Sequence, residues 1–149
     1  MINSRSITQL HPFVAEKARL FKEEAARQGI DIIFTSTYRD AESQNALYAI
    51  GRTVKGAGVS AKRPMGRVVT NAKAGESFHN HRVAFDVVPV VGGKAIWDDF
   101  VVWKKLGAIG ESLGLEWAGN WRTFKEYPHF QYTGGLTLAD FRAGKTMLV

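Results

Sequence analysis

The chain has 149 residues, of which 45% are hydrophobic and 23% are charged, and it contains no cysteine. This length suits one compact domain, and the composition is that of an ordinary soluble globular protein rather than a disordered one. Without cysteine there is no disulfide and no thiolate ligand or nucleophile, so any metal site must use His, Asp or Glu. The formal net charge of +6 predicts attraction to polyanions.

The N-terminal part is predicted to form a helix followed by a strand. Residues 12–28 carry apolar side chains at helical spacing, with a proline at the first position and Gly29 as the stop. Residues 30–35 are a short run rich in β-formers. We expect this run to enter the core as a strand.

A second helix is predicted over residues 40–50, with Asp40 as its N-cap and with Ala46 and Leu47 facing the core. The segment from Arg52 to Glu76 differs in composition, because six basic side chains stand among Gly, Ala and Pro without periodicity. Loops of this length in compact domains are usually functional or mobile. We therefore expect a long, mobile, basic loop at about residues 52–76.

The second half is predicted to contain most of the strands. Residues 83–91 are strongly β-branched, and Gly92-Gly93 is typical of a hairpin turn. Residues 99–113 return to helical spacing. Short strands are expected at residues 115–117 and 129–132, around a turn at 119–120, and a last helix at residues 137–145. This order favours an α+β fold, a small antiparallel sheet flanked by helices in a single domain over residues 1–149.

Candidate metal ligands stand close to acidic residues. Histidines occur at positions 11, 79, 81 and 129. A single histidine is more often a structural or surface residue than a ligand. His79 and His129 differ in their neighbours, because Asp86 follows His79 within a β-branched run and Glu126 precedes His129 by three positions.

The spacing of His79 and Asp86 sets a condition on the backbone. On a helix the two residues would lie about 10 Å apart along the axis, and on one unbroken strand they would point to opposite faces. Joint ligation therefore requires a turn near residues 81–82. Asp86 could instead be a buried partner of an arginine. A buried unpaired carboxylate is costly, however, and a metal ion is one of the few adequate partners.

Several motifs together resemble the VanY-like zinc peptidases, and specifically the phage L-alanyl-D-glutamate endopeptidases. They are Ser77-x-His79, Ala84-x-Asp86, Glu126-x-Pro128-His129-Phe130, Ser36-Thr37-Tyr38-Arg39, Gln44 with Leu47-Tyr48, Gly51-Arg52-Thr53, and Trp117 to Trp121. The similarity covers nearly the whole chain, and its specificity lies in the ordered set of motifs.

The resemblance implies that His79, Asp86 and His129 bind one zinc ion and leave a fourth position open, as in catalytic zinc sites. It also implies that Glu126 is the general base, which takes a proton from water and later protonates the leaving amine. Arg39 matches a family arginine that binds a substrate carboxylate or carbonyl oxygen.

Three further residues are assigned by resemblance to the substrate cleft or to the support of the ligands: Ser77, His81 and Gln44. For His81 a structural or surface role is the stronger interpretation. Two positions depart from the family pattern. Most members have Gly where Arg82 stands, and most phage enzymes have Asp where Glu126 stands. A positive φ at residue 82 would strain an arginine.

The expected function is that of an endolysin, a zinc-dependent hydrolase of the L-Ala–D-Glu bond in the peptidoglycan stem peptide. We expect a monomer with no nucleic-acid partner and no stable membrane insertion. The N-terminus lacks the apolar stretch of a signal peptide. This predicts synthesis in the host cytoplasm and action in the periplasm once the membrane has been permeabilised. A D-Ala-D-Ala carboxypeptidase or dipeptidase is the alternative. A non-catalytic binder of wall polymer or nucleic acid would leave the His/Asp/His set unexplained.

Overall fold

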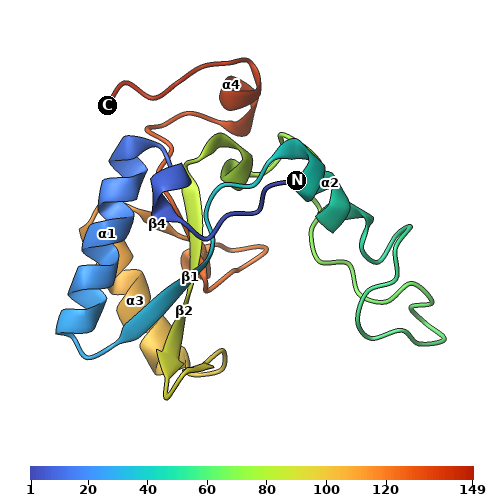
Figure 1. The fold of residues 1–149 in the computed structure, drawn as a ribbon, viewed down its shortest axis with the longest axis horizontal. Coiled ribbons are helices and arrows are strands. Elements are labelled where there is room, and N and C mark those ends of the chain that lie inside the picture. Colours follow the sequence, from blue (N-terminus) through green and yellow to red (C-terminus); the bar gives the residue numbers. More distant parts are fainter.

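The computed structural model describes all 149 residues and shows one antiparallel sheet with α-helices around it (Figure 1). The sheet has the strand order β1-β2-β5-β4, and β3 pairs with the far end of β2. The strands are β1 (Asp31–Ser36), β2 (Ala84–Val91), β3 (Lys94–Ala95), β4 (Glu116–Trp117) and β5 (His129–Gln131). The helices are α1 (Pro12–Arg27), α2 (Ala41–Ala49), α3 (Phe100–Ser112) and α4 (Leu138–Arg142). The predicted α+β fold is confirmed.

Local signals account for the ends of these elements. Asp40 and Asp99 cap α2 and α3, each accepting a hydrogen bond from a backbone N–H of the first turn. Gly92 and Gly93 have φ values of 57° and 78° and form the tight turn between β2 and β3. Such a turn requires positive φ at both positions, which explains the predicted hairpin.

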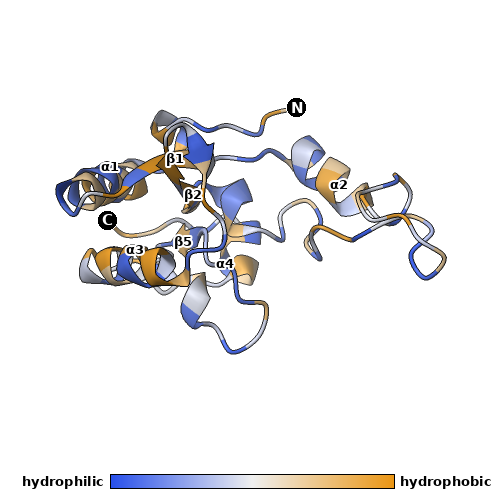
Figure 2. Cartoon of the chain, turned by 90° about the horizontal axis from the view of Figure 1, so that it is seen from below, coloured by the Kyte–Doolittle hydropathy of each residue, from blue (hydrophilic) through white to orange (hydrophobic).

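Helices α1 and α3 lie side by side and cover one face of the sheet (Figure 1). The buried face of α1 consists of Val14, Ala18, Phe21 and Ala25, in agreement with the helical spacing. Figure 2 shows hydrophilic and hydrophobic residues alternating along both helices, as expected where one side of a helix is buried.

Aromatic contacts join these helices to the sheet. The ring of Phe21 lies 5.9 Å from that of Phe85 in β2 and 4.8 Å from that of Phe130 in β5. Gly110 of α3 lies against the Phe130 ring, where a Cβ atom would clash with the ring carbons. The absence of a side chain at Gly110 therefore allows α3 to approach β5 closely.

The other face of the sheet presents polar side chains. Successive residues of a strand point to opposite faces, so Phe85 and Phe130 face the helices while Asp86, His129 and Gln131 face away from them. Asp86 is the direct cross-strand partner of His129. The candidate ligands are thus brought together by strand register.

The interior of α2 differs from the prediction. Ala46 is exposed and Leu47 is only partly buried, whereas Ser43 and Gln44 are buried. The inward position predicted for Ala46 is therefore wrong. The reason is that α2 lies apart from the main core, beside the long loop (Figure 1), so that its inner side meets polar loop backbone and the Arg39 side chain.

The predicted loop at residues 52–76 contains no helix or strand and projects away from the sheet in both views (Figures 1 and 2). Its C-terminal end is tied to α2, because Gln44 Nε2 donates to the Ala72 carbonyl at 2.7 Å and Asn45 Oδ1 accepts from the Ala74 amide at 3.0 Å. No helix in the structure combines the length and the apolar character that crossing a membrane requires.

Candidate metal centre

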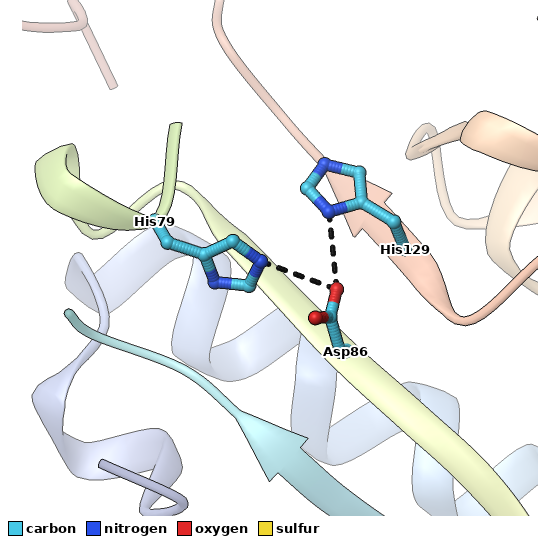
Figure 3. Close-up of side chains that lie close together, drawn as sticks. All are labelled: His79, Asp86 and His129. Atoms are coloured by element: carbon cyan, nitrogen blue, oxygen red, sulfur yellow. Dashed lines mark hydrogen bonds and ion pairs between the residues drawn. The ribbon is translucent and has the colours of Figure 1, made fainter. Parts of the chain in front are cut away.

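Three potential ligands converge on the open face of the sheet. Asp86 Oδ1 lies 3.2 Å from His79 Nε2 and 3.0 Å from His129 Nδ1. One ligand atom of each residue lies within 4.8 Å of those of the other two. Figure 3 shows Asp86 on β2 between His79, which precedes the strand, and His129 on the neighbouring strand. The three residues predicted from the sequence therefore form one cluster.

The turn required between His79 and Asp86 is present. His79 lies in a short 3-10 helix, η2 (Phe78–His81), and Ser77 caps η2 by accepting a hydrogen bond from the His79 amide. Arg82 ends η2 with φ 64° and ψ 24°, the left-handed conformation. Its guanidinium stacks on the Tyr38 ring at 3.7 Å and donates to the Gln9 carbonyl at 2.8 Å. These contacts offset the strain of a non-glycine residue in this conformation.

The outward nitrogen of each histidine is held by a hydrogen-bond acceptor. His79 Nδ1 donates to the Thr37 carbonyl at 2.9 Å. His129 Nε2 donates to Gln131 Oε1 at 2.8 Å, and Gln131 Nε2 donates to Glu116 at 3.3 Å. With a proton on each outward nitrogen, His79 Nε2 and His129 Nδ1 are directed at Asp86 and can act as ligands.

The charges of the cluster suit a cation. Burial alone would raise the pKa of Asp86, but the positive charge of His79 and the hydrogen bonds from both histidines outweigh it and hold the pKa well below its usual range. Burial alone would lower the pKa of His129, but the hydrogen bond and charge of Asp86 raise it. His129 must therefore release its inward proton when a metal binds. A carboxylate between two imidazoles is a donor set that zinc uses.

Glu126 stands at the edge of this cluster. Its Oε2 atom lies 3.8 Å from His129 Nδ1, and more than half of its side chain is exposed. The Glu126 amide donates to the Ala118 carbonyl at 3.3 Å, which ties the turn before β5 to the segment after β4. A carboxylate is thus placed beside the metal ligands and remains open to water.

Arg39 lies on another side of the same cleft without a carboxylate partner. Its Nη1 donates to Gln44 Oε1 at 2.9 Å and its Nη2 to Ser36 Oγ at 3.1 Å, while its Nε is buried without a partner. Burial lowers the pKa of Arg39, and the charges of Asp86 and Glu126 oppose this only in part. The result is a positioned guanidinium with unused donor capacity.

The contacts of Gln44 and His81 are with residues other than the three candidate ligands. Gln44 is fully buried and joins the Arg39 guanidinium to the loop carbonyl of Ala72. His81 is not part of the metal cluster, because its Nε2 atom bonds to the Gly75 carbonyl at 2.9 Å and its ring stacks on Phe141. Its contacts are those of a structural residue that joins η2 to α4.

A cleft of about 770 Å³ joins these groups. Its walls include the three candidate ligands together with Arg39, Ser77, Trp121 and Glu126. The Trp121 ring lies 5.6 Å from that of His129. The cleft is large enough to admit a peptide segment to the metal cluster.

Sequence reasoning missed the acceptors that hold the two histidines. Gln131 stands two positions after His129 in a predicted strand, and the alternation of a strand puts both on one face. That periodicity was a usable signal for Gln131. Thr37 contributes a backbone carbonyl, for which no residue-type signal exists, and Glu116 is found only through its pairing with Gln131.

Comparison with known proteins agrees with this geometry. Residues 70–132 match the M15 peptidase family model described as D-alanyl-D-alanine carboxypeptidase. The chain is 36% identical over 133 residues to the peptidoglycan L-alanyl-D-glutamate endopeptidase CwlK of Bacillus subtilis, with 83% of this chain and 74% of CwlK covered. The chain belongs to the M15, VanY-like metallopeptidase family.

Solved structures share the fold of this metallopeptidase. The L-Ala D-Glu endopeptidase ChiX of Serratia marcescens superposes with a TM-score of 0.58 at 22% identity, covering 94% of this chain and 92% of ChiX. The vancomycin-resistance D,D-pentapeptidase VanY, solved as a mutant in complex with Zn(II), gives a TM-score of 0.60 at 16% identity, with 92% and 80% covered. The His/Asp/His site is thus found in a metallopeptidase fold.

Proposed function

We propose that this metallopeptidase hydrolyses the L-Ala–D-Glu bond in the stem peptide of bacterial peptidoglycan. The observation that carries the proposal is the 36% identity to CwlK, which spans 83% of the chain. Residues 70–132, which match the M15 family model, include His79, Asp86 and His129. ChiX, whose name states the same bond specificity, has the same fold over nearly its full length.

We infer that one zinc ion is the metal. Two imidazole nitrogens and one carboxylate oxygen are zinc ligands, and three protein ligands leave a position open for chemistry. VanY, which shares the fold, was solved with Zn(II). Bound at this site, zinc would supply Lewis acidity, which polarises a carbonyl group and makes water more acidic.

Glu126 and Arg39 are proposed to supply the remaining chemistry. Glu126 lies beside the ligands and is open to water, so its carboxylate takes the proton of the attacking water and passes it to the leaving amine. Arg39 lines the cleft and offers its planar guanidinium to a carboxylate or carbonyl oxygen of the substrate. Ser77 and Gln44 hold His79 and Arg39 in place.

The experiment is the digestion of purified peptidoglycan, followed by mass spectrometry of the released fragments, with and without a chelator. The proposal predicts new N-terminal D-Glu and chelator-sensitive cleavage. New C-terminal D-Ala without new D-Glu would instead support the D-alanyl-D-alanine carboxypeptidase activity that the matched family model names. If the zinc-loaded protein cleaves no bond, the result would support a non-catalytic role in binding wall polymer or another polyanion.

An endolysin role is a further proposal, drawn from the likeness of the motifs to phage enzymes. In that role a monomer made in the host cytoplasm reaches the wall after the membrane is opened. The net positive charge of the chain supports attraction to acidic wall polymers. Expression in a Gram-negative host should cause lysis only together with a membrane-permeabilising agent, and lysis by the protein alone would contradict the proposed dependence.

A further inference from the structure

The metal cleft continues beyond Glu126 into a second hollow of about 560 Å³. Lys125 and Glu126 line both parts, so the two hollows form one path that passes the candidate base. The residues that line only the second part are Val68, Asn71, Phe124 and Arg142. We refer to these four residues as the distal end of the cleft.

Four charged side chains line the second hollow. Glu76, Lys125 and Glu126 are shared with the metal cleft, and the Arg142 guanidinium is the one charged group at the distal end. None of the ion pairs in the chain includes Arg142. A Cβ atom placed on Gly75 would lie 3.8 Å from both Cγ and Nε of Arg142, so the arginine stem runs along the glycine backbone. A cation without a partner is therefore available to an anionic ligand.

The position of Arg142 relative to the metal centre is set by aromatic packing. Arg142 lies in α4, and the neighbouring Phe141 stacks on His81 at 5.2 Å and meets the edge of Phe78 at 6.1 Å. Both partners belong to η2, the helix that presents His79. Helix α4 is thus fixed against the element that carries a metal ligand.

The apolar part of the distal end is exposed. Phe124 is 76% exposed and Val68 is 47% exposed. Phe124 also has a φ of 53°, a left-handed conformation that costs free energy for a bulky residue and that occurs most often at ligand sites. Exposed apolar side chains beside a free guanidinium suit a ligand that combines an aliphatic stem with a carboxylate.

The direction of the path follows from the chemistry of Glu126. The group that protonates the leaving amine must lie beside it, so the carboxyl side of the scissile bond passes Glu126. Arg39 lines the metal cleft and not the second hollow, whereas Arg142 lines only the second hollow. The two guanidinium groups therefore meet different parts of one peptide.

Resting on the proposed function, we propose that the distal end is a subsite for a carboxylate-bearing residue that follows D-Glu in the stem peptide. Arg142 binds that carboxylate, and Phe124 and Val68 contact the aliphatic part of the same residue. Arg39 is left to bind the carboxylate of D-Glu itself or the scissile carbonyl. The subsite thus selects for peptides that extend beyond the scissile bond with an acidic residue.

The test uses zinc-loaded protein and two soluble peptides that contain the L-Ala–D-Glu bond. In one peptide the residue after D-Glu has a free carboxylate, and in the other this group is a carboxamide. Arg142→Gln should raise KM for the acidic peptide roughly twofold to fivefold, the range expected for an exposed ion pair. The same substitution should leave kcat unchanged for both peptides and KM unchanged for the amidated peptide. Arg142→Lys keeps a positive charge and should raise KM for the acidic peptide less than Arg142→Gln does.

Arg122→Gln is the matched control, because Arg122 is exposed and lines neither part of the cleft. An equal change for both peptides in Arg142→Gln would assign Arg142 a structural role and overturn the subsite. Unchanged kinetics in Arg142→Gln would overturn it as well. If wild-type protein cleaves neither peptide at L-Ala–D-Glu, the proposed function fails first and the subsite falls with it.

Discussion

The metal centre and the basic loop differ in how their polar side chains are held. In the metal centre each histidine has a fixed acceptor on its outward nitrogen, and both rings are buried. The loop at residues 52–76 carries six basic side chains and one acidic one, so it has a net charge of +5 out of +6 for the chain. None of its side chains forms an ion pair.

This difference determines how each region responds to change. The metal centre depends on individual atoms at fixed positions, so the loss of one ligand atom removes the site. The loop depends on summed charge, which each side chain supplies in part and which salt screens within about 8 Å at physiological ionic strength. Substitutions of the three candidate ligands should therefore act all-or-none, whereas substitutions in the loop should act gradually.

The largest effect is expected for the ligands. His129→Ala and Asp86→Ala should each lose bound zinc and activity, because two remaining ligands hold zinc poorly. His81→Ala is the matched control and should keep zinc, since His81 forms a hydrogen bond to the Gly75 carbonyl and stacks on the Phe141 ring. Zinc content per folded chain and turnover on peptidoglycan are the measurements. A His129→Ala protein with one zinc and full turnover would disprove the ligand assignment.

Glu126→Gln should cost roughly a hundredfold to ten-thousandfold in kcat, because glutamine cannot accept the proton of the attacking water. Zinc content and melting temperature should stay close to wild-type values, since Glu126 is exposed and its Oε2 atom lies 3.8 Å from His129 Nδ1, beyond hydrogen-bond distance. Glu126→Asp keeps a carboxylate and should keep measurable activity. Normal lysis of peptidoglycan by Glu126→Gln would place the base elsewhere.

Gln131→Leu should weaken zinc binding roughly tenfold to a hundredfold, the usual range when a ligand histidine loses its supporting acceptor. The zinc dissociation constant, measured against a competing chelator, tests this apart from activity. The double variant Gln131→Glu with Glu116→Gln exchanges the amide and the carboxylate of these two residues and keeps an acceptor for His129. It should recover most of the affinity, and equal losses in both proteins would show that Gln131 serves only packing.

The smallest effect is expected from the loop. Lys62→Ser with Arg63→Ser should weaken binding to intact sacculi a few-fold at low salt and less as salt rises, because exposed charges are screened. Cleavage of a small soluble peptide should hardly change. Lys22→Ser with Lys105→Ser removes the same charge from α1 and α3 and serves as the control. Equal losses on both substrates at all salt concentrations would give the loop a catalytic or structural role.

Periodic signals in the sequence were enough for most elements of the fold. The spacing of Val14, Ala18, Phe21 and Ala25 predicted the buried face of α1, and the glycine pair at 92–93 predicted the hairpin. These signals work because local geometry repeats every 3.6 or 2 residues and the core favours apolar side chains. The same reasoning failed for α2, whose inner side meets polar groups instead of the core.

For the site, the motifs of the sequence predicted, through their resemblance to the family, the three residues that the structure brings together, and the spacing predicted a turn between His79 and Asp86. The odd spacing of His79 and Asp86 excluded one straight strand, and Arg82 with φ 64° provides that turn. Only the tertiary structure decided that the Thr37 carbonyl holds His79, that Glu116 supports Gln131, and that α4 brings Arg142 to the far end of the cleft. These relations join residues distant along the chain through strand register and aromatic packing, and no local periodicity encodes such contacts.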